Sequence, residues 1–161
     1  MLQSETYVLW DTLFHDEGTS EPATGTWVNT GFNASFSDNG TLLTATQTFC
    51  TYFANIGSTS AIYDFASPFI VEFDLINFTT GDFQIFDQTN NCTRTFAELG
   101  CTSNNHIKIV NHGTIVKYYV DGVEKTSKQF NYAMGICRMG FRNTSSSQET
   151  IKFKNFVIYP V

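Results

Sequence analysis

Apolar and polar residues alternate with a period of two along most of this chain, and this alternation limits its fold more than any other feature. In residues 68–78, PFIVEFDLINF, every second residue from Phe69 to Leu75 is apolar, whereas Glu72 and Asp74 between them are acidic. Successive side chains of a β-strand point to opposite faces of the sheet, so this segment is predicted to be a strand with one buried face. The same alternation occurs in HIKIVNHG, TIVKYYV, ICRMGFRN and TIKFKN.

Turn-forming residues separate these runs at the spacing of an all-β domain. The turn sequences are Asp38-Asn39-Gly40, Thr80-Gly81-Asp82, Asn90-Asn91, Ser103-Asn104-Asn105, His112-Gly113 and Asp121-Gly122. Asp-Gly and Asn-Gly suit the primed turns of β-hairpins, because those turns need positive φ. We expect about ten to twelve strands and one helical turn around Phe96 to Leu99. That many strands in one chain imply two packed antiparallel sheets, a sandwich or jelly roll.

Length, charge and hydropathy exclude several classes of protein. The 161 residues suffice for one domain with a sizeable core, and 16% of them are aromatic, which suits pleated sheets. A formal net charge of −6 and only 9 Lys and Arg leave no electrostatic footprint for nucleic acid. The sequence contains no apolar run of about 18 residues, so no transmembrane helix is predicted. The opening MLQSETYVLWD lacks the basic and apolar regions of a signal peptide.

Four segments, in the right order, resemble the laminin-G-like, concanavalin-A-like jelly-roll superfamily. HIKIVNHGTIVKYYVDG resembles its core meander, in which an apolar strand and a short turn precede a YVDG hairpin. SPFIVEFDL resembles an earlier strand, IKFKNFVIYPV the closing strand that returns beside the first, and LFHDEGTSEPATGTWV the opening segment. The resemblance covers nearly the whole chain. It implies one all-β domain over residues 1–161, an antiparallel two-sheet jelly-roll sandwich of the concanavalin A-like type.

A closer resemblance suggests where such a domain works. The pieces NHIKI, KYYVDGVEKT and IKFKNFVIYP look like C-terminal domains of adhesin-like proteins of methanogenic archaea and of the tail fibres of their viruses. This resemblance implies a domain excised from a larger surface or tail-fibre protein, extracellular, on a virion tail or cell surface. Its partner would be a surface glycan or cell-wall polymer. Because single sugar contacts are weak, the parent protein is expected to be multimeric.

The strongest catalytic pattern is Glu72-Phe73-Asp74-Leu75-Ile76. Retaining glucanases on the fold that this chain resembles carry Glu-x-Asp-x-Glu on one strand, which supplies the nucleophile and the general acid/base. Ile76 stands where the third carboxylate is needed, so the proton donor is missing and no enzyme activity is predicted. The alternative interpretation places Glu72 and Asp74 on a polar sheet face, opposite Arg138 or Arg142, as charge pairs across strands.

Metal, thiol and imidazole chemistry receive little support. Many relatives of the resembled fold bind calcium with an Asp from each terminal strand; here Asp16 and Glu17 are candidates, but Asn155 replaces the second Asp. A structural calcium ion is left open, and no cofactor is predicted. The four cysteines form either two disulfides, with three connectivities, or buried free thiols: Cys50, Cys92, Cys101 and Cys137. The dispersed histidines are interpreted as surface residues: His15, His106 and His112.

A glycan site on this fold would combine aromatic rings with Asp, Asn and Arg hydrogen bonds. Candidates in loops or at the rim are Trp27, Tyr52, Phe86, Asp87, Asn90, Arg94 and Tyr132. Of these, the predicted ligand contacts are Tyr52, Asp87, Asn90, Arg94 and Tyr132. Five N-glycosylation sequons would place their asparagines outward if the host glycosylates them: Asn33, Asn39, Asn77, Asn91 and Asn143.

Three functions are compatible with these observations. The first, which we favour, is a non-catalytic, lectin-like module that attaches a virion or cell to a surface polymer. The second is a small glycoside hydrolase or polysaccharide lyase on the same fold. The third is a passive structural or oligomerisation module of a fibre. Jelly rolls carry many functions, so fold alone does not choose among them.

Overall fold

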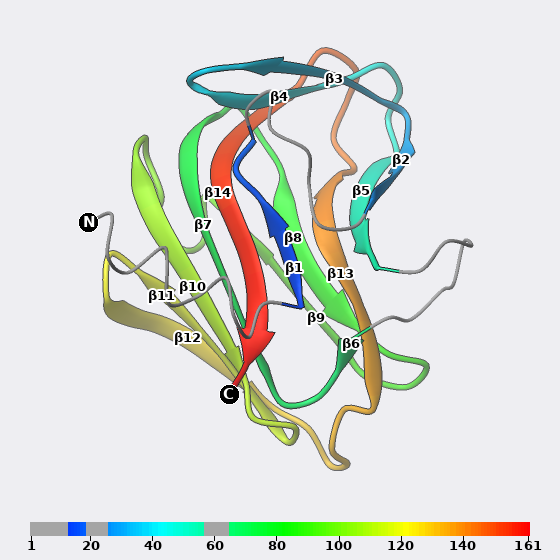
Figure 1. Cartoon of the computed structure of the whole chain (residues 1–161), viewed down its shortest axis with the longest axis vertical. Helices are drawn as coiled ribbons and strands as arrows, with labels where there is room; N and C mark the ends of the chain where they lie inside the picture. Colours follow the sequence, from blue (N-terminus) through cyan, green and yellow to red (C-terminus); the bar gives the residue numbers. More distant parts are fainter. Residues whose placement is uncertain (1–12, 19–25, 57–64) are drawn as a thin grey trace.

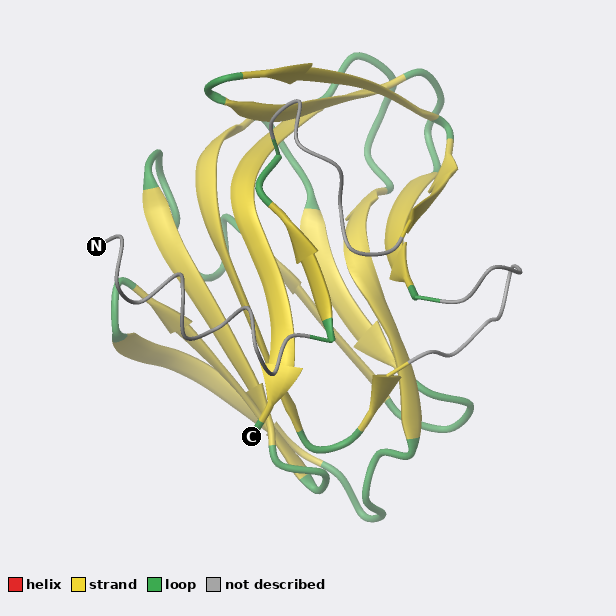
Figure 2. Ribbon diagram, viewed as in Figure 1, coloured by secondary structure: helices red, strands yellow, loops and turns green. Residues whose placement is uncertain are grey.

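The computed structural model describes residues 13–18, 26–56 and 65–161, in which every regular element is a β-strand (Figure 2). No helix that could cross a membrane occurs in these ranges. The strands are β1 (Phe14–Asp16), β2 (Thr26–Thr30), β3 (Phe32–Ser37), β4 (Gly40–Ala45), β5 (Cys50–Asn55), β6 (Phe65–Ala66), β7 (Phe69–Phe78), β8 (Asp82–Phe86), β9 (Asn91–Thr95), β10 (Asn105–Asn111), β11 (Ile115–Val120), β12 (Val123–Gln129), β13 (Ile136–Asn143) and β14 (Thr150–Pro160).

The strands form two antiparallel sheets that pack face to face (Figure 1). The eight-stranded sheet has the order β12-β11-β10-β7-β14-β4-β3, with β1 paired to β14. The six-stranded sheet has the order β2-β5-β13-β8-β9, with β6 paired to β13. The predicted two-sheet jelly-roll sandwich is confirmed, and the closing strand lies beside the first one.

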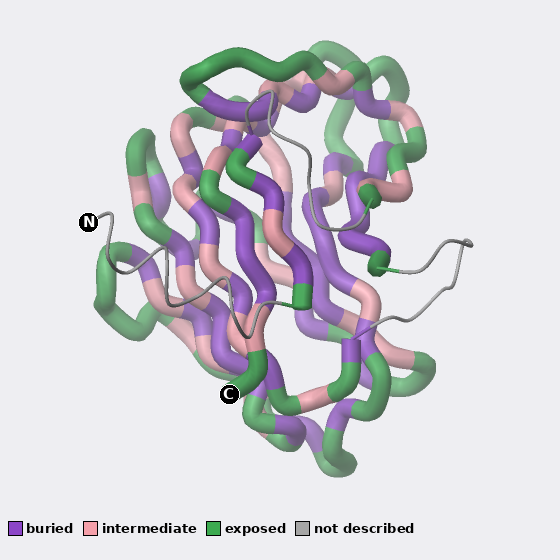
Figure 3. The backbone as a smooth tube through the Cα atoms, in the orientation of Figure 1, coloured by how far each residue is buried: buried purple, intermediate pink, exposed green. Residues whose placement is uncertain are grey.

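The period-two patterns point their apolar residues into the space between the sheets. Buried and partly exposed residues alternate along the strands (Figure 3), and along β7 the alternation is strict from Phe69 to Leu75. Glu72 and Asp74 therefore face outward. The same holds for β11, where Val116, Tyr118 and Val120 are buried. Strand β5 differs, because all of its residues are buried on both faces. No alternation in accessibility therefore marks that strand.

Aromatic rings from both sheets meet in the core. Phe73 of β7 stacks on Phe83 of β8 with ring centroids 5.3 Å apart and meets Phe141 of β13 edge-on at 5.0 Å. Phe153 of β14 stacks on Phe141 at 4.4 Å. Each such pair contributes about 0.5–1.5 kcal/mol beyond the area it buries, so these contacts fix the spacing of the sheets.

The turn residues adopt the conformations that their types favour. Asp121 and Gly122, between β11 and β12, have φ values of 51° and 82°, as a primed hairpin turn requires. The predicted helical turn at residues 96–99 is a hydrogen-bonded turn in which the Cys101 amide donates to the Phe96 carbonyl at 3.0 Å.

Two expectations about single residue types are settled by burial. All four cysteines are buried free thiols, so the disulfide alternative is wrong. Burial raises the pKa of Cys101 and Cys137 to about 11, which keeps both protonated at neutral pH. Among the sequons, Asn143 is only 1% exposed, and its amide group donates to the Ser146 carbonyl at 2.9 Å. Asn143 therefore does not face outward, as glycosylation of its sequon would require.

Gly140 in β13 should be the glycine least tolerant of a side chain. A Cβ atom there would lie 2.1 Å from the Tyr52 carbonyl oxygen and 2.6 Å from the Phe53 ring. Because backbone has to move, Gly140→Ala is expected to lower the free energy of unfolding by about 3 kcal/mol or more. Gly135→Ala is the matched control, since its Cβ would meet nothing within 4 Å. Urea unfolding of both variants tests this; equal stabilities would contradict it.

Candidate functional site

The outer face of the eight-stranded sheet carries a hydrogen-bonded group, here called the His106 cluster. It comprises Glu72, Asp74, His106, Asn155 and Tyr159. The imidazole lies 2.8 Å from the Asp74 carboxylate through Nδ1 and 2.9 Å from that of Glu72 through Nε2. The second Asp74 oxygen accepts from the Asn155 amide at 2.8 Å, and the second Glu72 oxygen accepts from the Tyr159 hydroxyl. Both ring nitrogens and both carboxylates are thus occupied.

The charges of the His106 cluster do not suit acid catalysis. Hydrogen bonds to Asp74 and Glu72 raise the pKa of His106 to about 9, so the imidazole is cationic at neutral pH. Burial alone would raise the pKa of Glu72 and of Asp74, but their bonds to His106 and to Tyr159 or Asn155 outweigh it and lower both pKa values. Both carboxylates are ionised, so neither can protonate a leaving group at neutral pH.

Glu72 and Asp74 do not face the arginines that the sequence suggested, because those arginines belong to the other sheet. Arg142 in β13 forms a bidentate pair with Asp82, with Nε–Oδ1 and Nη2–Oδ2 distances of 3.0 and 2.9 Å. Arg138 lies over the ring of Phe53, with its guanidinium carbon 4.7 Å from the ring centroid. The predicted charge pairs between Glu72 or Asp74 and these arginines are therefore wrong.

The side chains of two candidate calcium ligands, Asp16 and Asn155, bond different partners. Asp16 is buried, and its two oxygens accept from the Gly18 amide at 2.8 Å and from the Trp27 indole at 2.6 Å. The Asn155 side chain is exposed and donates to Asp74 instead. Within the described ranges no group of three or more candidate metal ligands occurs. Asp16 and Asn155 therefore do not fit a shared calcium ion.

The outer face of the six-stranded sheet presents a mixed aromatic and polar surface. Arg138 of β13 pairs across the sheet with Phe86 of β8, and the Phe53 and Phe86 rings are 5.7 Å apart. Gly140 provides the space in which the Phe53 ring lies against the sheet. Phe53 itself is only 4% exposed, whereas Arg138 and Phe86 are both partly exposed.

At one end of this face, two loops are tied together by Asp87. We call the turn 87–90 and the loop 130–135 the Asp87 rim. One Asp87 oxygen accepts from the amides of Thr89 and Asn90 at 2.8 and 2.6 Å, and the other accepts from the Gly135 amide at 2.9 Å. Burial works against the charged form, but these backbone bonds outweigh it and lower the pKa of Asp87. Its oxygens are committed to holding the loops.

Three of the five predicted site residues meet at the Asp87 rim. The buried Asn90 side chain donates to the Tyr132 carbonyl at 3.3 Å and to Asp87 at 3.4 Å. The Tyr132 side chain is 77% exposed, and Ile136 beside this loop is 56% exposed. Asp87 and Asn90 thus position the loop, and Tyr132 is the residue available to a ligand.

The structure does not bring the other two predicted residues to this rim. Tyr52 lies in β5, is 3% exposed and stacks on Trp27 with ring centroids 4.5 Å apart. The prediction that these two rings are loop or rim residues is wrong, because both lie in strands and pack on the core. Arg94 pairs in register with the buried Phe83, so it lies on the core-facing side of edge strand β9, where it approaches Glu98 at 3.6 Å.

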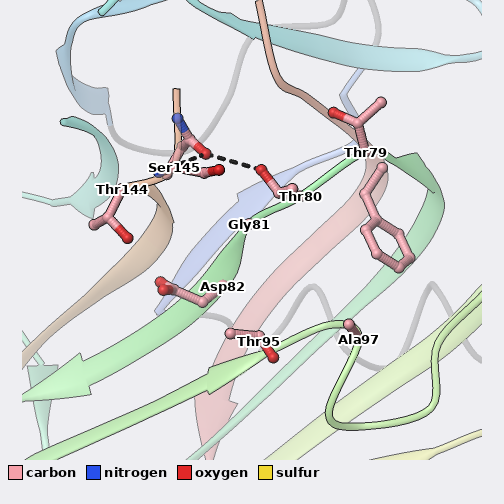
Figure 4. A pocket seen from close by; sticks show the side chains of 10 residues that line it. Thr79, Thr80, Gly81, Asp82, Thr95, Ala97, Thr144 and Ser145 are labelled. Carbon is pink, nitrogen blue, oxygen red and sulfur yellow. Dashed lines mark hydrogen bonds between the residues drawn. The ribbon is translucent and has the colours of Figure 1, made fainter. Parts of the chain in front are cut away.

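A second feature was missed by the sequence argument. At the other end of β8, a cavity of about 220 Å³ opens beside the Asp82–Arg142 pair (Figure 4). Threonine and serine side chains of the β7–β8 and β13–β14 connections line it, together with Thr95 of β9. The Thr80-Gly81-Asp82 sequence was interpreted only as a turn. Nothing local indicates that residues 144–145, far along the chain, lie next to it.

No protein-family model and no curated protein matches the chain. Solved structures do. A Bacillus subtilis protein of unknown function with a galectin-like fold matches with a TM-score of 0.64 at 12% identity, over 92% of this chain and 95% of the other. The carbohydrate-binding module CBM66 from Bacillus subtilis matches with 0.54 at 11%, over 84% and 97%. The Bacillus licheniformis β-glucanase matches with 0.51 at 12%, over 92% and 97%. At these identities the likeness shows the fold alone, a two-sheet jelly-roll sandwich.

The His106 cluster predicts a specific dependence of stability on pH. The pKa of His106 rises from its ordinary 6.5 to about 9 on folding. Its contribution to stability is therefore complete below pH 6.5 and is lost as the pH rises through about 9. The ring is half exposed, so after allowance for solvent screening we expect about 1 kcal/mol, or a Tm shift of about 2–4 °C.

Thermal melts of wild type and His106→Gln across this pH range test the expectation. The Tm difference should be largest below pH 6.5 and should shrink as the pH passes about 9. His112→Gln, in the turn between β10 and β11, controls for the loss of a histidine. A difference that stays constant, or grows with pH, would show that His106 does not act as a charged partner of Glu72 and Asp74.

Proposed function

We propose that this domain is a non-catalytic recognition module that binds a surface glycan or cell-wall polymer at the Asp87 rim. The observation that carries the proposal is the exposed ring of Tyr132 on a loop whose backbone is held by Asp87 and Asn90. Sugar rings present C–H groups that pack on aromatic faces, while their hydroxyls need polar partners nearby. A loop that is already fixed loses little conformational entropy on binding.

Polar groups next to the rim complement the ring. Arg138 and Asn91 lie on the outer face of the six-stranded sheet, at the ends of β13 and β8–β9 that adjoin the rim. The Asn91 side chain is exposed and accepts from Thr93 at 2.8 Å. The fold shared with a carbohydrate-binding module and a galectin-like protein is consistent with sugar recognition.

The absence of catalysis is part of this proposal. Glu72 and Asp74 are the only carboxylates that the sequence placed in a glucanase-like pattern. Both are ionised and bound to His106, and Ile76 follows them. A retaining mechanism needs one carboxylic acid that is protonated before the bond breaks.

The origin of the domain also belongs to the proposal. We place it in a larger extracellular protein, an adhesin or a viral tail fibre of methanogenic archaea, on the basis of the resemblance of KYYVDGVEKT and IKFKNFVIYP. One rim of this size would bind sugar weakly. Several copies on a multimeric parent would convert weak contacts into useful avidity.

Tyr132→Ala should weaken binding about tenfold, since it removes the exposed ring but no core contact. The measurement is binding of a multimerised domain to an array of glycans and cell-wall polymers, with folding checked by Tm. Tyr119→Ala, which removes a ring from the outer face of the other sheet, is the matched control. Arg94→Ala should also bind like the parent. If Tyr132→Ala binds normally while Arg138→Ala does not, the sheet face and not the rim is the site.

The domain should not hydrolyse β-glucans. Incubation with laminarin or another β-glucan should release no reducing ends above the level given by Glu72→Gln. Turnover that disappears in a Glu72→Gln variant that remains folded would contradict the non-catalytic assignment and restore the glycoside hydrolase alternative.

A further inference from the structure

The cavity beside β8 has the size and lining of a site for one small polar molecule. Its volume is about 220 Å³, below the range of about 300–1,000 Å³ for drug-sized ligands. Half of the lining residues carry a hydroxyl group, with one apolar ring and one carboxylate among the others, and most of the exposed wall is apolar (Figure 4). The lining residues are Phe78, Thr79, Thr80, Gly81, Asp82, Thr95, Ala97, Asn143, Thr144 and Ser145.

The charge at the cavity favours a neutral ligand. Asp82 is 5% exposed, and its carboxylate forms two short bonds to the Arg142 guanidinium. A carboxylate has about four acceptor positions, so the pair leaves some unused. The arginine disfavours a bound cation, and the carboxylate disfavours a bound anion. A hydroxyl group, which brings no charge, can donate to Asp82 at little electrostatic cost.

The hydroxyls on the wall are of two kinds. Thr79 and Thr80 are fixed: the Thr79 hydroxyl oxygen accepts from the Thr150 amide at 2.7 Å, and the Thr80 hydroxyl donates to the Asn143 side chain at 3.0 Å. The side-chain hydroxyls of Thr144 and Ser145 have no hydrogen-bond partner among the described residues. The first pair shapes the cavity, and the second pair is free to bond a ligand.

An apolar wall completes the arrangement. The half-buried ring of Phe78 lines the cavity and packs on Phe96, with centroids 5.5 Å apart. A sugar ring has an apolar face of C–H groups and an edge that carries hydroxyls. The Phe78 ring on one side of the cavity suits the C–H face, and the hydroxyls and the buried carboxylate on the other side suit the edge.

We propose that this cavity binds a single neutral sugar unit, as a second site distinct from the Asp87 rim. The two sites lie at opposite ends of β8, roughly 17 Å apart along a strand of this length. Neither shares a side chain with the other. The cavity can therefore hold a sugar whether or not the rim binds a polymer, and the two proposals can fail separately.

Titration of the isotope-labelled domain with neutral monosaccharides tests the site: glucose, galactose, mannose, fructose and N-acetylglucosamine. For at least one sugar, the backbone amide signals of residues 79–82 and 144–145 should shift and saturate. A ligand of this size should have a dissociation constant on the order of 1–10 mM. If no sugar gives saturable shifts there, the proposal is wrong.

Substitutions then tie the shifts to the cavity. Ala97 is exposed and lines the cavity, so Ala97→Phe fills it without disturbing the core and should abolish the shifts. Ser103→Phe, at an exposed turn outside the lining, is the matched control and should leave them unchanged. Asp82→Asn should weaken binding at least tenfold. Saturable shifts that persist in a folded Ala97→Phe variant would overturn the assignment.

The same titration separates this site from the proposed function. Tyr132→Ala should keep the shifts at residues 79–82, because the rim does not touch the cavity. Polymer binding that depends on Tyr132, without any monosaccharide effect at the cavity, would support the rim site and contradict the second site. Monosaccharide binding at the cavity without polymer binding at the rim would do the reverse.

Discussion

The layer of phenylalanine rings between the sheets is the interaction on which the rest of the molecule depends. Phe73 and Phe153 from one sheet interlock with Phe83 and Phe141 from the other, at centroid separations of 4.4 to 5.3 Å. All four rings are fully buried. Because this layer fills the space between the sheets, a ligand site among the described residues has to lie on an outer face or in the loops at the ends.

The Asp87 rim illustrates the difference between residues that contact a ligand and residues that hold the contacting loop in position. The sequence argument chose Asp87 and Asn90 because such groups bond sugar hydroxyls. In the structure both are occupied with backbone groups of their own turn and of the 130–135 loop. Such loops on a rigid scaffold are where binding is usually found. The two residues stabilise that scaffold, and the exposed Tyr132 remains for the ligand.

Local patterns predicted the faces of strands, but not the partners of each residue. The alternation around Glu72 and Asp74 correctly placed both on an outer face. Their partner, His106, lies 32 residues beyond Asp74, and only the pairing of β7 with β10 brings them together. The predicted pairing of these carboxylates with Arg138 is wrong for the same reason, since alternation in the sequence does not show which sheet a strand joins.

The prediction that Tyr52 is a rim residue is wrong for a different reason. In CTYFAN the face of the strand that points away from the core is also covered, so β5 is buried throughout. A ring in such a strand has no polar and apolar neighbours in alternation to mark its side. From the sequence alone, such a ring cannot be distinguished from a ring in a loop. The cavity at residues 79–82 and 144–145 was also invisible, because it is formed by connections distant in the chain.

The His106 cluster has a structural consequence at the closing strand. Asn155 has a φ of 54°, and the register between β14 and β7 shifts between Lys154 and Val157. A bulge of this kind bends a strand and disrupts its hydrogen-bond ladder. The side chains of Asn155, within the shifted segment, and of Tyr159, beyond it, bond Asp74 and Glu72 of β7, and His106 of β10 joins both carboxylates. Side chains thus connect three strands where the backbone ladder is interrupted. Within the shifted segment, Phe156 of β14 pairs with Asp16 of β1, so the cluster also supports the strand that brings Asp16 to Trp27.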